Sequence, residues 1–164
     1  MRHGAAMLAG LAGLVGLAAL ALVLYLQFAR QVPPCSLCVY QRLADLAMIF
    51  LILLGFFLLR RWSWALAGIA AGVGAILAAW QWHLADIAAQ HRVEACANIQ
   101  LLPQTVFSSP AIGSPLASAL AGKGSCAVAG AHRLLGWPIT HWSLAFFLAC
   151  ALLLTLAVLL TRRR

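Results

Sequence analysis

Four of the five cysteines in this 164-residue chain lie in two segments that interrupt long apolar stretches. Cys35 and Cys38 form a C-x-x-C pair, and Cys96 and Cys126 lie together in a later segment. Two thiols held close together can form a disulfide and exchange it with another pair, and each exchange transfers two electrons. Two such pairs in one chain indicate thiol–disulfide electron transfer.

Two other uses of these four cysteines are a metal site and structural disulfides. A C-x-x-C can be half of a metal site, but the second pair is separated by 30 residues, unlike the short knuckle typical of zinc. We therefore expect no metal site. Cys96 and Cys126 alone would also suit a structural disulfide, and from spacing alone four cysteines allow three pairings.

The residues before the C-x-x-C pair predict how it is held. The two prolines at 33 and 34 are unsuited to a helix interior but fit just before or in a first turn. A helix is therefore expected to begin around Cys35 or Ser36. Cys38 then lies in the first turn, where unpaired backbone N–H groups and the helix dipole favour its thiolate form.

Arg42 follows Cys38 by four residues, so the two side chains share one helix face. At this depth the guanidinium can meet a lipid-soluble ligand beside the sulfur. The alternatives are that Arg42 snorkels to the interface as an anchor, or forms an ion pair with Asp45 three residues later.

The later cysteine segment runs from about residue 83 to residue 141. It carries Cys96 and Cys126, shows little periodicity, and is expected to be mobile, as a shuttling disulfide requires. His83 and His91 flank its start and can supply a proton or a hydrogen bond to a bound redox ligand. Histidines in loops or at membrane interfaces more often only contact water.

The elements that must position these residues are membrane helices. Hydrophobic residues make up 65% of the chain, charged residues 9%, and the mean hydropathy is +0.98, which indicates an integral membrane protein. Four apolar segments, 5–28, 43–59, 64–82 and 143–161, are each near the roughly 20 residues that span a bilayer. We predict an all-α membrane protein, a four-transmembrane-helix bundle.

The four segments form a single integral membrane domain, residues 1–164, with two extracytoplasmic loops, 29–42 and the long 83–142. The first segment exceeds the roughly 7 to 15 apolar residues of a signal peptide and has no clear A-x-A cleavage site. We therefore expect a retained helix. The six tryptophans fall at predicted interfaces, where they would act as anchors.

Lysine and arginine placement predicts the orientation. The densest basic positions are Arg2, Arg60, Arg61 and 162–164, which the positive-inside rule assigns to the cytoplasm. Both termini are therefore expected to be cytoplasmic and both loops periplasmic. The net charge of +8 follows mainly from this topology, so we expect the lipid bilayer and no nucleic acid as a partner.

Residues 34–42 read P-C-S-L-C-V-Y-Q-R and resemble the P-C-x-L-C-x-x-x-R signature of the disulfide bond formation protein B (DsbB) family. The four-span layout, the second cysteine pair and residues 134–142 are similar to that family too, so the resemblance covers nearly the whole chain. These are thiol–quinone oxidoreductases of the bacterial inner membrane. The resemblance implies a multi-pass bundle that reoxidises a periplasmic DsbA-like thiol oxidase.

The resemblance also implies a role for each site residue and the pairing of 35 with 38 and 96 with 126. Cys96 would form the mixed disulfide with the partner, and Cys126 would be displaced from it. Cys126 would then attack Cys35, which frees Cys38 as the thiolate that donates to the quinone. Arg42 would hold the quinone and stabilise that thiolate.

The cofactor implied by the resemblance is ubiquinone or menaquinone. His83 sits where some members place a histidine on the quinone side. Gln41 stands where some members have an acid, and we assign it no role.

Two competing functions remain open. One is a membrane thiol reductase, or a quinone or epoxide reductase, of similar four-helix design; an electron carrier across the bilayer would need cysteines within the helices. Only Cys150 is so placed, and we interpret it as a small apolar filler. The other is a non-catalytic membrane scaffold whose loops are stapled by two disulfides.

Overall fold

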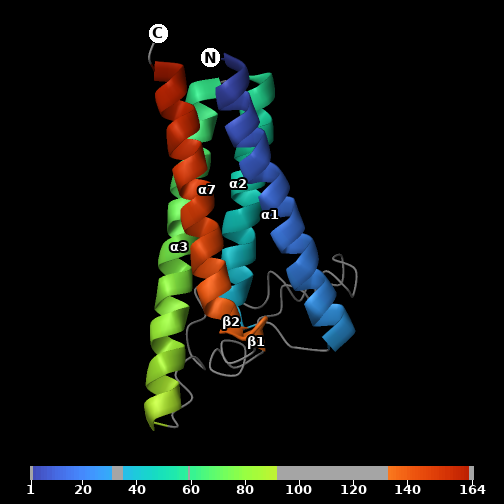
Figure 1. Cartoon of the computed structure of the whole chain (residues 1–164), viewed down its shortest axis with the longest axis vertical. Coiled ribbons are helices and arrows are strands. Elements are labelled where there is room, and N and C mark those ends of the chain that lie inside the picture. The colour runs from blue at the N-terminus through green and yellow to red at the C-terminus, as the bar shows by residue number, and fades with distance from the viewer. Residues whose placement is uncertain (1, 31–34, 59, 92–132, 163–164) are drawn as a thin grey trace, which may run out of the picture.

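The protein is a bundle of four long helices, shown in Figure 1 as a computed structural model. The structure describes residues 2–30, 35–58, 60–91 and 133–162. These residues form α1 (Arg2–Arg30), α2 (Ser36–Phe57), α3 (Arg60–His91) and α7 (Ile139–Arg162), together with β1 (Arg133–Leu134) and β2 (Trp137–Pro138). All four helices are long and apolar enough to cross a membrane. The fold is therefore the predicted four-helix membrane bundle.

α2, α3 and α7 pack closely, and α1 completes the bundle. α3 packs against both α2 and α7, and α1 packs against α7 and α2. Figure 1 shows the N- and C-terminal ends at one end of the bundle, and the start of α2 with the β-hairpin at the other. The C-x-x-C pair thus lies at the end opposite the termini.

Small residues allow the helices to approach one another. Ala5, Ala9 and Ala12 of α1 are fully buried, in a stripe with helical spacing, while large apolar side chains of α1 such as Leu14 point outward. Close approach through small residues is typical of membrane helices, because lipid supplies no hydrophobic drive for their association. α1 is therefore an integral part of the bundle.

Trp64 departs from the prediction that every tryptophan is an interfacial anchor. Its side chain is fully buried, and a Cβ added at Gly55 would overlap its indole ring. The glycine leaves room for the ring between α2 and α3, so Trp64 packs in the core. By contrast, Trp62 is 69% exposed, as an anchor would be.

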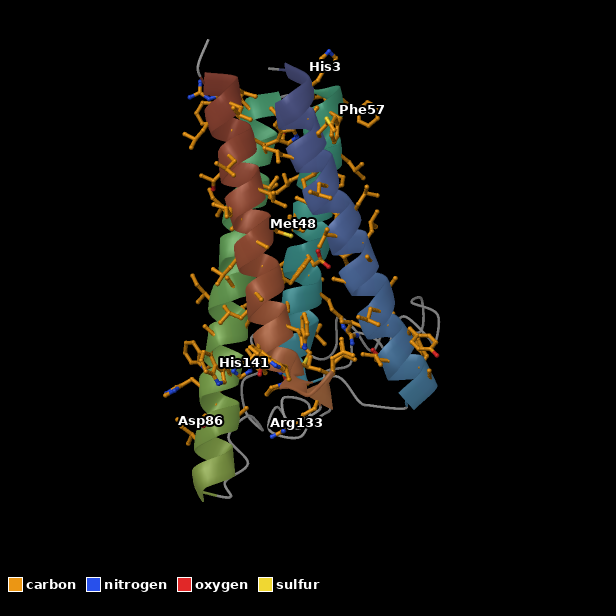
Figure 2. All side chains as sticks on the ribbon, in the orientation of Figure 1. His3, Met48, Phe57, Asp86, Arg133 and His141 are labelled. Carbon is orange, nitrogen blue, oxygen red and sulfur yellow. The ribbon has the colours of Figure 1, made fainter. Side chains whose placement is uncertain are left out.

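The helices also differ in extent from the apolar segments. α2 begins at Ser36, as the prolines predict, so the later part of the expected loop 29–42 is helical. The polar side chains of this first part of α2 face other helices and not water, which hydropathy alone does not register. α3 continues past residue 82 to His91, and Figure 2 shows Asp86 on this extension.

A short hairpin leads into α7. β1 and β2 pair antiparallel with Leu134 opposite Trp137, and the turn places Leu135 and Gly136 at positive φ, 53° and 84°. Two central residues with positive φ match the twist of a tight hairpin, and glycine adopts that region without strain. The indole nitrogen of Trp142 donates to the carbonyl oxygen of Leu134 at 3.0 Å, which ties the hairpin to the first turn of α7.

Candidate functional site

The C-x-x-C pair forms the N-terminal end of α2. Cys35 is the N-cap residue, with φ −81° and ψ 165°, and its sulfur accepts a hydrogen bond from the Cys38 backbone N–H at 3.2 Å. Cys35 is fully buried, whereas Cys38 is partly exposed. The helix end therefore holds the two sulfurs together and leaves Cys38 as the more accessible one.

Gln81 of α3 contacts both sulfurs. Its side-chain nitrogen lies 3.3 Å from Cys38 Sγ and 3.5 Å from Cys35 Sγ, within the range for N–H···S hydrogen bonds. This residue was not predicted from the sequence as part of the site. It is the one amide in the apolar segment 64–82, and an isolated polar residue within a membrane helix was the signal that would have found it.

A chain of polar side chains fixes the Gln81 amide. The Gln41 side-chain nitrogen donates to Gln81 Oε1 at 2.8 Å, and the Ser143 hydroxyl donates to Gln41 Oε1 at 2.8 Å. Gln81 and Gln41 are buried, with 3% and 8% of their surfaces exposed. The chain joins α7, α2 and α3 at the level of the thiols. Gln41, to which the sequence analysis assigned no role, therefore belongs to the surroundings of the site.

Arg42 is buried in the bundle, not extended toward an interface. Only 8% of its surface is exposed, and its Nη1 donates to Gln27 Oε1 of α1 at 2.6 Å. Its positive charge favours the thiolate forms of Cys38 and Cys35. Snorkelling is thus not its role, and a fixed cation lies beside the dithiol.

Asp45, the other partner considered for Arg42, is also buried, with 4% of its surface exposed. Its Oδ1 has no hydrogen-bond partner among the residues that the structure describes. It points toward α1, where a Cβ added at Gly16 would lie 2.9 Å from this oxygen. Gln27, and not Asp45, is the acceptor for Arg42 Nη1.

Three other residues singled out from the sequence, His83, His91 and Cys150, lie on α3 and α7. His83 lies on α3 with an exposed side chain, and His91 is the last residue of that helix. Cys150 is fully buried in the main core cluster, with its sulfur 4.0 Å from the carbonyl oxygen of Ala12, whereas Cys35 belongs to a separate cluster. Cys96 and Cys126 lie outside the described residues, so their roles remain predictions.

An aromatic cluster covers the neighbouring part of the bundle. The His141 ring lies 4.6 Å from the Trp82 ring and 6.1 Å from the Trp137 ring, and Figure 2 shows His141 between α3 and α7. Trp82 directly follows Gln81, so this cluster lies at the same level of α3 as the amide that contacts the two sulfurs. His141 was not predicted from the sequence as a site residue.

A buried dithiol at a helix N-terminus, with a cation and amide donors beside it, is suited to disulfide exchange. Comparison with known families gives a matching result: the family model of disulfide bond formation protein DsbB matches residues 5–157. No curated protein and no solved structure matches the chain. Membership of this family implies a membrane oxidoreductase that acts on disulfides and has a thiol oxidase partner. The match covers nearly all of the four-helix bundle, and the chain therefore belongs to the DsbB family.

Proposed function

We propose that the protein reoxidises a periplasmic DsbA-type thiol oxidase and passes the two electrons to a membrane quinone. The observation that carries this proposal is the set of groups around one dithiol: Cys35 and Cys38 at the start of α2, the Gln81 amide on both sulfurs, and the buried Arg42 guanidinium. A structural disulfide would need neither the amide nor the cation.

The proposed electron path uses two exchanges that each conserve two electrons. The reduced partner gives its electrons to the Cys96–Cys126 disulfide and leaves as a disulfide. Cys126 then attacks Cys35: a bond forms between these sulfurs, the Cys35–Cys38 bond breaks, and its electron pair leaves with Cys38. Cys96 displaces Cys35 from Cys126, which restores the first disulfide and leaves Cys35 and Cys38 reduced.

The final acceptor must be more oxidising than the partner. A DsbA-type protein has a reduction potential of about −120 mV, so an ordinary protein disulfide is a poor sink for its electrons. A quinone supplies the missing chemistry when bound, because it takes up two electrons and two protons to become a quinol. The net reaction converts one partner dithiol and one quinone into one partner disulfide and one quinol.

The residues at the dithiol suit a quinone such as ubiquinone or menaquinone. Arg42 offers a buried cation to a carbonyl oxygen, and Gln27 holds that guanidinium in place. Cys38 is the partly exposed sulfur and therefore the better placed of the two to reach a ligand. Arg42 and Cys38 would hold the quinone, and the exposed His83 is a further candidate to reach it.

The proposal also includes the orientation of the protein in the membrane. We place the protein in the bacterial inner membrane with both termini cytoplasmic and the segments 29–42 and 83–142 toward the periplasm. Support comes from the basic residues near the termini and from the position of the dithiol at the opposite end of the bundle. A soluble periplasmic partner would then approach the side that holds Cys96 and Cys126.

The test is quinone reduction by the purified protein in detergent, with a reduced DsbA-type protein as donor. We expect the wild type to consume quinone, and Cys38→Ser and Cys96→Ser to lose this activity while still inserting in membranes. Cys150→Ser is the matched control, because Cys150 lies in a different cluster, and should retain activity. Turnover by Cys38→Ser would refute the assignment. Failure of every thiol donor and quinone tested would favour the stapled scaffold or another reductase.

A further inference from the structure

Gln81 of α3 is hydrogen-bonded through its side-chain amide to both sulfurs of the C-x-x-C pair. We propose that its amide N–H₂ group is a catalytic donor that stabilises the thiolate of Cys38, and that Gln41 and Ser143 are positioning residues that aim it. This inference deepens the proposed function and rests on it for the direction of electron flow. The hydrogen-bonding role itself can be tested without quinone or partner.

The orientation of the Gln81 amide decides what it can do. A glutamine side chain has an acceptor end and a donor end, and only the donor end favours a negatively charged sulfur. Gln81 Oε1 accepts a hydrogen bond from the side-chain nitrogen of Gln41, and Gln41 Oε1 in turn accepts one from the Ser143 hydroxyl. All three groups therefore donate in the same direction, toward the sulfurs. Hydrogen bonds arranged in series polarise one another, which strengthens the last donor.

The two N–H bonds of one amide match the two sulfurs. The amide nitrogen lies 3.3 Å from Cys38 Sγ and 3.5 Å from Cys35 Sγ, so a single group meets both ends of the bond that is made and broken. When Cys38 leaves as a thiolate, the negative charge develops next to a donor that is already in place. Such preorganised donors stabilise developing charge without reorganisation.

An amide also differs from a lysine or a histidine in this position. It neither gains nor loses a proton near neutral pH, so it stabilises the thiolate without taking up the protons that the final acceptor requires. Gln81 and Gln41 are both buried within an apolar bundle, where unpaired amides would be costly. Polar residues buried in membrane helices generally mark function, and the dithiol is the group at the end of this chain.

The experiment measures the pH profile of Cys38 alkylation by iodoacetamide in the reduced, full-length protein, with the Cys38 peptide read by mass spectrometry. For Gln81→Leu we expect the midpoint to move about one pH unit to the alkaline side, the equivalent of one hydrogen bond to a charged group. For Gln81→Glu we expect a larger shift in that direction, since a carboxylate repels the thiolate. For Ser143→Ala the shift should be smaller but of the same sign.

The control is Ala79→Leu, which places a leucine at an exposed position two residues earlier on α3 and should leave the profile unchanged. Circular dichroism and gel filtration confirm that each variant is folded. Profiles that coincide with the wild type, or equal shifts for Gln81→Leu and Gln81→Glu, would overturn the proposal. If Gln81→Leu does not fold, Ser143→Ala is the deciding variant. An unchanged alkylation profile for Ser143→Ala would show that the series of hydrogen-bond donors does not stabilise the Cys38 thiolate, and would overturn the proposal. None of these measurements uses quinone, so loss of quinone reduction alone would overturn only the proposed function.

Discussion

Removing the acceptor that holds Arg42 tests whether this guanidinium acts from a fixed position. Gln27→Leu deletes the oxygen that lies 2.6 Å from Arg42 Nη1, in surroundings where Gln27 and Arg42 are 9% and 8% exposed. A hydrogen bond to a charged group contributes about 1.5–3 kcal/mol. Since 1.4 kcal/mol corresponds to a factor of ten, we expect kcat/KM for quinone to fall roughly 10- to 100-fold.

The assay is steady-state quinone reduction in detergent, with the donor protein saturating. Arg42→Met serves as the reference variant, and the double variant with Gln27→Leu completes a mutant cycle. If Gln27 acts through Arg42, the double variant should be no worse than Arg42→Met alone. Ala29→Leu adds a leucine at an exposed position on the same helix and should have no effect. Losses that multiply in the double variant, or an unchanged Gln27→Leu, would refute the reasoning.

Three further predictions concern the packing around the site. A Cβ at Gly16 would lie 2.9 Å from Asp45 Oδ1, so Gly16→Ala should cost about 1–3 kcal/mol and lower the melting temperature in detergent. Gly72→Ala, which would meet nothing within 4 Å, should melt like the wild type, and equal losses in the two would contradict this contact. Asp45→Asn keeps the shape of a side chain whose Oδ1 has no partner among the described residues, and removes a buried charge. We expect it to raise the melting temperature at pH 8, and a large decrease would mean that the carboxylate is paired. Gly55→Ala would place a methyl group inside the Trp64 indole, so we expect it to abolish stable folding unless Trp64 is also made smaller; normal melting of the single variant would show that α2 and α3 can separate without cost.

The general fold could be predicted from the sequence because bilayer physics leaves few alternatives. Apolar segments of about 20 residues must form helices in lipid, where every backbone polar group has to be satisfied internally. The start of α2 could also be predicted, since prolines fix where a helix can begin. The burial of Trp64 could not be, because it depends on which residues of the neighbouring helix face this side chain.

The residues of the site also divide into those that could be predicted from the sequence and those that could not. Cys35, Cys38 and Arg42 are close in sequence and share a signature that predicts them together. Gln81 is 43 residues from Cys38, and Ser143 is 102 residues from Gln41, so no spacing rule connects them. These contacts depend on which helices become neighbours. Amides isolated within apolar segments were the available signal, but such a signal does not identify their partners.

The N-cap of α2 links redox state to local order. Helices usually begin with an oxygen-bearing side chain that accepts a backbone N–H, but here the sulfur of Cys35 does so for Cys38. The atom proposed to be attacked during exchange is therefore also the atom that closes the first turn. When that sulfur bonds to another partner, we expect the cap to weaken and the amide of Cys38 to exchange with solvent faster. Hydrogen exchange at one backbone position would then report the progress of the catalytic cycle.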